Sequence, residues 1–242
     1  MKTLEIESLH GISICHSITV SCREIFNPLT YKFETGKVYC ITTKEHNSLA
    51  SWALASALGG RMEEDYNGTI YLDGIVVNQR ALQEKACFVA DDRVLLPKYE
   101  ITEKFNVYNF DYNRFLVNEH FDDRCACAKD IIERALAESK SDHSLESIKQ
   151  KFKLSDERLV RDIRFVSNEI WLISIAIGYA EGRSIFIFPL IDLKNASIIN
   201  GLDNIIEELK QDGKMIIIPV MNMADIHLKC NAIINTGIGS AD

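Results

Sequence analysis

The sequence predicts an α/β protein, because short apolar runs that suit strands alternate with segments that suit helices. Between about residues 91 and 164 the chain becomes charged and helix-favouring, which indicates a helical insertion. With 4 Pro and 12 Gly among 242 residues, the composition is that of an ordinary folded chain. We therefore expect β-α-β units that build a parallel sheet covered on both faces.

The charge balance narrows the classes of partner. The chain has 27 Lys and Arg residues against 35 Asp and Glu residues, a formal net charge of −8, whereas a nucleic-acid binder needs a basic surface to neutralise phosphates. The longest uncharged stretch, residues 46–60, is shorter than the about 20 apolar residues of a membrane-spanning helix. Acidic residues within the first ten positions argue against a signal peptide, and the seven cysteines have no disulfide spacing. We expect a cytoplasmic protein that binds small molecules or other proteins, with no nucleic acid.

The amino-terminal part is predicted to be rich in strands. The run at residues 37–42 is apolar on both faces and predicts a buried strand, and residues 49–58, rich in Ala and Leu, predict a helix that Gly59 and Gly60 stop. Asp73-Gly74 favours a tight hairpin turn. The other strands are expected at residues 4–6, 12–15, 29–33, 69–72, 75–77 and 86–90, the last of them buried on composition.

The carboxy-terminal part returns to alternation after the helical block. Residues 130–139 and 144–152 are the clearest amphipathic helices of that block. After it we expect helices at residues 169–180 and 196–210, and strands at residues 185–188, 215–218 and 232–235.

Five segments, in this order, resemble the nucleotide-binding subunit of ABC transporters. Residues 33–41 (FETGKVYCI) are similar to the strand that enters that family's phosphate loop, and residues 67–74 (NGTIYLDG) to its G-T-I-x-L-D-G hairpin. Residues 86–102, 213–218 and 230–234 follow the strand with the Q-loop, the stretch before the switch histidine, and the last strand, where Asn231 replaces an Asp. The resemblance implies a P-loop NTPase-like ABC ATPase fold: a mixed or parallel sheet core, an antiparallel β-subdomain and an inserted helical subdomain. It implies one domain over residues 1–242, with a core lobe at about 1–90 and 165–242 and the helical subdomain at about 91–164.

The phosphate loop that the resemblance implies lacks the groups that hold a nucleotide. A Walker A loop needs glycines, so that backbone N–H groups can surround the β-phosphate, and a Gly-Lys-Ser/Thr ending. No glycine occurs between Gly36 and Gly59, and Glu45 adds a negative charge where the ligand is most anionic. Lys44 or Ser51 could still contact a phosphate. The degenerate positions are Thr43, Lys44, Glu45, His46, Asn47, Ser48, Leu49, Ala50 and Ser51.

The remaining motif positions also lack the family's residues. A Walker B strand ends in Asp-Glu, which hold Mg²⁺ and orient the attacking water, yet this strand continues into Pro189 and Leu190, with Asp192 as the nearest following acid. We expect a loop or helix-cap role for Asp192. The signature falls on Val166, Ser167, Asn168 and Glu169, the Q-loop glutamine position on Asp91, and the switch histidine position on Met221. The sequence therefore has no recognisable site for Mg-ATP hydrolysis; we expect no cofactor and no catalytic residue, and weak ATP binding stays open.

The resemblance implies a catalytically inactive pseudo-ATPase that pairs with an active ATP-binding subunit, with a membrane permease, or with both, as a dimer. It would be cytoplasmic, and peripheral on the inner face of the membrane where a permease binds it. Two alternatives remain: an ABC-type ATPase or other enzyme with a non-standard site, and a soluble scaffold.

Three other features of the sequence are candidate functional sites. The run at residues 120–127 (HFDDRCAC) contains metal-ligand residue types, but it lacks the C-x₂-C spacing of structural zinc sites, and we favour the start of a partly exposed helix over a metal site. A cysteine nucleophile paired with a histidine has no local signature here. The apolar and aromatic residues at 95–110 fit a protein interface or burial in the helical block.

Overall fold

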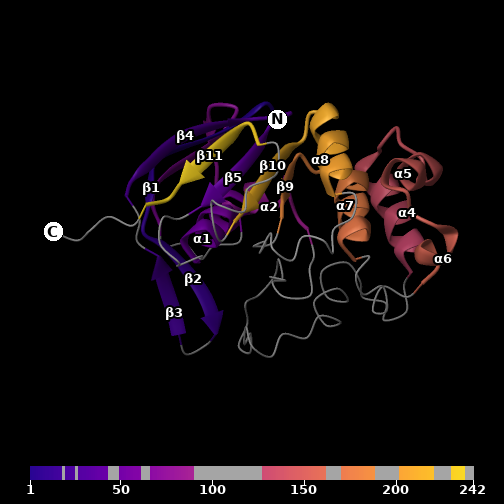
Figure 1. Cartoon of the computed structure of the whole chain (residues 1–242), viewed down its shortest axis with the longest axis horizontal. Helices are drawn as coiled ribbons and strands as arrows, with labels where there is room; N and C mark the ends of the chain where they lie inside the picture. Colours follow the sequence, from indigo (N-terminus) through magenta and orange to yellow (C-terminus); the bar gives the residue numbers. More distant parts are fainter. Residues whose placement is uncertain are drawn as a thin grey trace.

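The computed structural model of the chain describes residues 1–17, 20–24, 27–42, 49–60, 66–89, 127–161, 170–188, 202–220 and 230–237 (Figure 1). All structural statements below concern these residues. Within them, no helix is both long enough and apolar enough to cross a membrane.

A five-stranded parallel sheet forms the centre, with the spatial order β11-β5-β10-β9-β8. Its middle strands consist almost wholly of buried apolar residues, as expected for a sheet with helices on both faces. The predicted parallel β-α-β arrangement is therefore confirmed. The strands are β5 (Val38–Thr42), β8 (Ala86–Phe88), β9 (Ile185–Ile187), β10 (Met215–Pro219) and β11 (Ala232–Asn235).

A second sheet is antiparallel and has the order β4-β1-β6-β7. Its last hairpin turns at Asp73 and Gly74, whose φ angles are 50° and 80°, as a tight turn of this kind requires. A separate hairpin joins β2 (Ile12–Ser17) to β3 (Val20–Glu24). The strands of the larger sheet are β1 (Thr3–His10), β4 (Leu29–Glu34), β6 (Asn67–Leu72) and β7 (Ile75–Val76).

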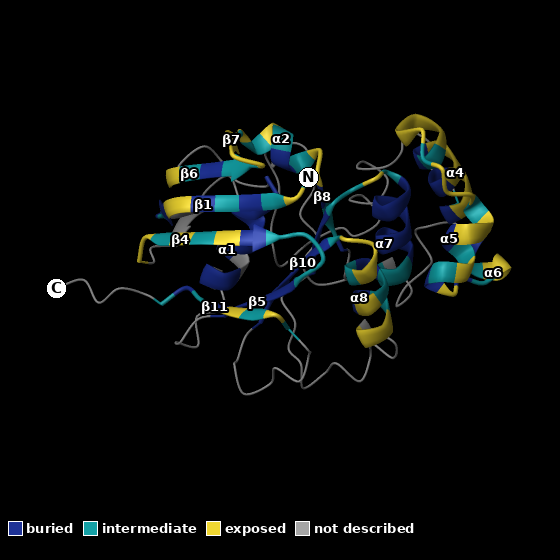
Figure 2. Ribbon diagram, turned by 90° about the horizontal axis from the view of Figure 1, so that it is seen from above, coloured by how far each residue is buried: buried dark blue, intermediate teal, exposed yellow. Residues whose placement is uncertain are grey.

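Helix α1 (Leu49–Leu58) lies between the two sheets (Figure 2). Alternate residues of β5 face opposite layers: Tyr39 and Ile41 pack with α1 and the antiparallel sheet, whereas Val38 and Cys40 pack on the other side. Because α1 is enclosed by both sheets, its apolar residues are needed all round the helix, and this explains the uniform Ala and Leu composition.

The opposite face of the parallel sheet is covered by α7 (Ile170–Ala180) and α8 (Leu202–Gln211). Beyond α7 lie α4 (Ala128–Ser139), α5 (Leu145–Phe152) and α6 (Asp156–Leu159), so that α7 is sandwiched and almost fully buried (Figures 1 and 2). Ser144 begins α5 with a reciprocal capping box: its Oγ accepts from the Ser147 N–H, and its own N–H donates to the Ser147 Oγ.

The structure corrects the sequence interpretation in a few places. Strand β8 was expected to be buried, but it is the edge strand of its sheet, so Cys87 and Phe88 are only half-buried. The patterns also gave no indication of β3, of α2 (Gln79–Gln83) or of α6. These elements have only five, five and four residues, too few for a periodic pattern to identify them.

Candidate functional site

The carboxyl ends of the parallel strands form the edge at which an α/β sheet of this kind binds ligands. From β5 the chain crosses to β8 at the far side of the sheet, and from β10 it crosses to β11 at the other side. The neighbouring strands β5 and β10 are therefore the topological switch point, where connections to opposite sides leave a crevice outside the strand ends. Hydrogen bonds hold this edge in register: the Val220 N–H donates to the Ile41 oxygen at 2.8 Å.

Helix α1 begins at this edge, because it follows β5 after only six residues. A helix amino terminus carries free N–H groups and a partial positive charge, which is the usual feature for binding phosphate. Of the nine predicted phosphate-loop positions, the structure describes Leu49, Ala50 and Ser51, which form the first turn of α1. Ala50 and Ser51 are fully buried. Thr43, Lys44, Glu45, His46, Asn47 and Ser48 lie outside the described residues.

The other predicted positions lie outside the described residues as well, but residues next to them are described. Asp91 comes two residues after Val89, Pro189 directly follows Phe188, and Met221 directly follows Val220. Val89, Phe188 and Val220 each come just after the carboxyl end of β8, β9 and β10, respectively. The structure thus brings the chain to the same sheet edge just before the Q-loop, Walker B and switch positions (Asp91; Pro189, Leu190; Met221).

The signature positions (Val166, Ser167, Asn168, Glu169) precede α7, whose start lies at the same edge. Helix α7 leads through a short turn to the amino end of β9, so it runs antiparallel to that strand. The Trp171 ring, in the first turn of α7, lies 6.2 Å from the Phe188 ring, which follows the carboxyl end of β9. Trp171 packs against the core on that face.

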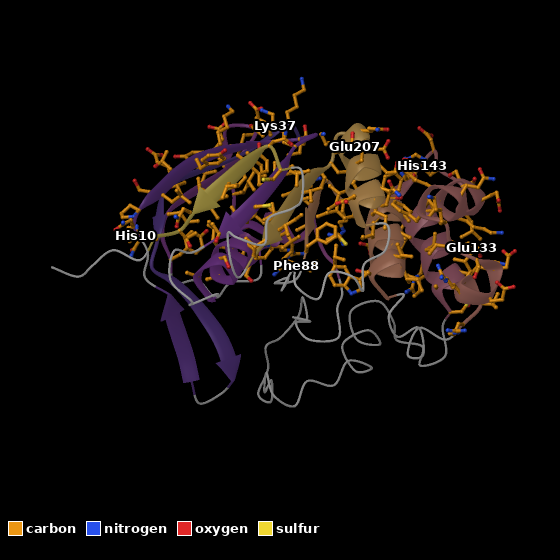
Figure 3. The ribbon with its side chains drawn as sticks, viewed as in Figure 1. His10, Lys37, Phe88, Glu133, His143 and Glu207 are labelled. Carbon is orange, nitrogen blue, oxygen red and sulfur yellow. The ribbon has the colours of Figure 1, made fainter. Side chains whose placement is uncertain are left out.

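Both Gly-Lys pairs of the chain lie at the opposite edge. Gly36-Lys37 directly precedes β5 and Gly213-Lys214 directly precedes β10, with φ angles of 73° and 68° at the two glycines. Figure 3 shows Lys37, at the amino end of β5, on the far side of the sheet from Phe88, at the carboxyl end of β8. These glycines make tight turns into strands, so neither pair can serve as the end of a phosphate loop.

The described part of the ligand edge carries no ionisable side chain on the residues that end or directly follow the five strands. Its polar groups come mainly from β11 and β5: the Thr236 N–H and Oγ1 donate to the Thr42 oxygen at 2.9 and 3.2 Å. Beside them, the buried Oδ1 of Asn235 has no hydrogen-bond partner within the described ranges. Asn235 and Thr236 are not among the predicted site positions, although polar residues at the end of an apolar strand are a signal for this edge.

The described cysteines give no support to nucleophilic chemistry. Burial, together with the neighbouring Cys230, raises the pKa of the Cys40 thiol, so Cys40 stays protonated and unreactive. In the run at 120–127, only Cys127 is described; it begins α4 as its N-cap residue, without a side-chain capping bond. In the described ranges, no group of three or more His, Cys, Asp or Glu residues is placed to hold a metal ion.

Comparisons with known proteins give the same fold and little sequence similarity. No protein-family model and no curated protein matches the chain. Among solved structures, a putative ABC transporter ATP-binding protein from Pyrococcus furiosus is similar at 15% identity and a TM-score of 0.62, covering 97% of each chain. CbiO1 from Clostridium perfringens, part of an ABC transporter complex, is similar at 13% identity and a TM-score of 0.62, over 98% of this chain and 86% of that one.

A third similar structure is a dimeric ATP-binding cassette in a post-hydrolysis state with ADP and Pi. It has 13% identity and a TM-score of 0.61, with 98% of this chain and 97% of that chain covered. Such low identities show the fold alone. The sheet order, the position of α1 and the similarity to these structures show that the chain has the α/β fold of ABC transporter ATP-binding domains.

Proposed function

We propose that this chain is an ABC-type ATP-binding-protein-like subunit that keeps the fold and has lost catalytic ATP turnover. The observation that carries the proposal is the connection from β5 to α1. It lies at the switch point of the sheet, where this fold would hold a nucleotide, yet its six residues (TKEHNS) contain no glycine. A sequence without glycine disfavours a loop whose successive N–H groups turn inward around a phosphate, because the left-handed conformations that this needs are strained for other residues.

The sequence supports the same conclusion at the other motifs. It contains no G-x-x-x-x-G-K-[ST] phosphate loop and no Gly-Gly-Gln of a signature. Its one Asp-Glu pair, Asp156-Glu157, begins α6 and does not follow a strand of the parallel sheet. Mg²⁺ needs oxygen ligands, commonly carboxylates. Asp192 is the nearest acid after β9 in the sequence, five residues beyond the strand's last residue, Ile187. The chemistry of hydrolysis therefore has no evident carboxylate at the end of that strand.

A subunit of this kind would act through partners. One similar structure is described as part of an ABC transporter complex and another as a dimer, and we extend both features to this chain. It would pair with an active ATP-binding subunit, with a membrane permease, or with both, and would support or regulate transport from the inner face of the membrane. In this role the fold supplies interfaces, and the partner supplies turnover.

The first test measures nucleotide binding and turnover with the purified protein. Titration with a fluorescent ATP analogue, followed by a phosphate-release assay, should show weak or no binding and no Mg-ATP hydrolysis above background. Lys44→Ala and Asp192→Asn should leave that background unchanged, as should the control Lys129→Ala on the exposed side of α4. An ordinary ATPase rate that Lys44→Ala or Asp192→Asn abolishes would overturn the proposal and establish an enzyme with a non-standard site.

The second test concerns partners. The tagged chain should co-purify from detergent-solubilised membranes with a polytopic membrane protein or a second ATP-binding subunit, identified by mass spectrometry. Membrane association without ATP binding indicates a structural subunit, and binding without turnover indicates a regulatory nucleotide site. If the chain neither associates with such a partner nor binds ATP, the proposal is contradicted, and a soluble scaffold becomes the favoured function.

A further inference from the structure

Helices α5, α7 and α8 meet at the edge of the parallel sheet opposite to the candidate ligand edge. Lys151 of α5 reaches across to α8, where its Nζ lies 3.0 Å from Glu208 Oε2, and to Asp212 just after α8, 2.9 Å from Oδ2. The Lys151 side chain is 21% exposed and that of Asp212 is 30% exposed. Figure 3 shows that His143, before α5, and Glu207, on α8, both lie on this side of the molecule, away from Phe88.

Tyr179 of α7 also contacts Asp212. Its hydroxyl donates to the same Asp212 Oδ2 at 2.6 Å, and the residue is 5% exposed. Lys214 Nζ lies 5.0 Å from the ring centroid and Lys151 Nζ lies 5.7 Å from it. Asp212 Oδ2 therefore receives one bond from Lys151, which belongs to the inserted helices α4–α6, and another from Tyr179 of α7, which covers the sheet.

The groups that face this junction are balanced in charge. Lys151 and Lys214 face Glu208 and Asp212, and Lys214 Nζ also donates to the Arg183 oxygen at 2.8 Å. The rings of His143 and Phe152 lie 5.0 and 5.3 Å from the Tyr179 ring. Burial disfavours the charge on Asp212, but its bonds from Tyr179 and Lys151 outweigh this and lower its pKa. Burial also disfavours the charge on Lys151, and its two carboxylate partners outweigh this and raise its pKa. Both partners remain charged at neutral pH.

The contact of the inserted helices with α7 is of a different kind. It is made by apolar side chains that belong to one continuous core, among them Ile132 of α4, Phe152 of α5 and Ile177 of α7. A bond from Ser139 Oγ to the Ala180 oxygen, 2.7 Å long, also ties the ends of α4 and α7. An apolar contact tolerates a small rotation, whereas paired charges with fixed geometry hold one angle.

We propose that Lys151, Asp212 and Tyr179 form a polar latch that holds helices α4–α6 at one angle against α8. When the latch opens, α4–α6 turn on α7, which stays fixed to the sheet. The latch is a conformational device of the chain itself, and it requires neither nucleotide nor a transporter partner. A result that refutes the latch would therefore leave the proposed function untouched, and a result that refutes the proposed function would leave the latch untouched.

Hydrogen–deuterium exchange of the full chain, without nucleotide, tests the latch. Lys151→Met keeps the apolar stem and removes the charge, and Tyr179→Phe keeps the ring and removes one bond to Asp212. Each should speed exchange in α5 and in the last turn of α8 by about tenfold: Lys151→Met removes the ion pairs that opening must break, and Tyr179→Phe removes the bond that holds the Asp212 carboxylate in place for Lys151. Exchange in α7 and β10 should stay as in the unchanged protein.

Lys149→Met is the matched control. Lys149 lies on the same helix, carries the same charge and pairs with Asp156 and Glu146 inside the inserted helices, so it makes no part of the latch. It should leave the exchange of α8 unchanged. Unaltered exchange in Lys151→Met and Tyr179→Phe overturns the latch, and so does acceleration that spreads equally over α7 and β10, because that result describes general destabilisation. If Lys151→Met does not fold, the gentler Tyr179→Phe decides.

Discussion

Replacement of Gly178 by alanine should destabilise the protein, although alanine is the better helix former. Gly178 lies in α7 at the point where the helix crosses β8. A Cβ at this position would lie 2.3 Å from the Sγ and 2.6 Å from the Cβ of Cys87. The sulfur can rotate away, but the Cys87 Cβ is fixed to the strand backbone, so α7 must move off the sheet.

Two opposing effects set the size of the change. Glycine to alanine inside a helix contributes about 1 kcal/mol in favour of folding, whereas overpacking a filled core costs about 1–3 kcal/mol. Because the clash involves an atom that cannot move alone, we place the cost toward the upper end and expect a net loss of about 1–2 kcal/mol. For a chain of this length, that lowers Tm by about 2–8 °C.

Calorimetry and urea unfolding of Gly178→Ala, Cys87→Ala and the double variant measure this balance. Cys87→Ala removes the 2.3 Å contact and keeps the 2.6 Å one, so the loss caused by Gly178→Ala should shrink, but not vanish, in that background. A higher Tm for Gly178→Ala, or an equal loss in both backgrounds, would refute the steric argument.

Three further predictions concern other parts of the fold. Ser144→Ala removes the Oγ that accepts from the Ser147 N–H, while the backbone N–H of residue 144 can still donate to Ser147 Oγ; it should cost about 1 kcal/mol in urea unfolding, and a change below a few tenths would contradict the cap. Because burial raises the pKa of its thiol, Cys40 should react with a thiol reagent only on unfolding, as peptide mapping would show; prompt reaction in the native protein would contradict this. Burial also lowers the pKa of Lys214, so the folded state binds fewer protons than the unfolded state, and stability should rise as pH increases toward 10.5; Lys214→Met should flatten that slope in Tm, and an unchanged slope would exclude Lys214 as its source.

Much of the fold could be predicted from the sequence because the dominant signals are local. The helix at residues 49–58 and the strand at 232–235 were predicted with the bounds that α1 and β11 have, since an Ala- and Leu-rich run closed by Gly59-Gly60 and a short apolar run next to polar residues leave little choice. The parallel sheet followed from helices placed between apolar strands. The Asp73-Gly74 hairpin followed from turn chemistry.

The candidate site divides differently between sequence and structure. The absence of a glycine-rich phosphate loop is a property of the residues themselves, so the sequence alone establishes it. Which strand lies beside β5, and hence where a switch point exists, depends on pairings between residues far apart in the chain, such as Ile218 with Cys40. No local pattern contains that information.

The sequence by itself thus determined the class of the fold, most of its elements and the absence of glycine between Gly36 and Gly59, because each of these depends on neighbouring residues. Only the tertiary structure decided that both Gly-Lys pairs face away from the ligand edge, that Gly178 sits against Cys87, and that Lys151 reaches Asp212. These are contacts between segments that the chain brings together only when the sheet closes. Their energy comes from packing and from partly buried charges, and the spacing of residues along the chain predicts neither.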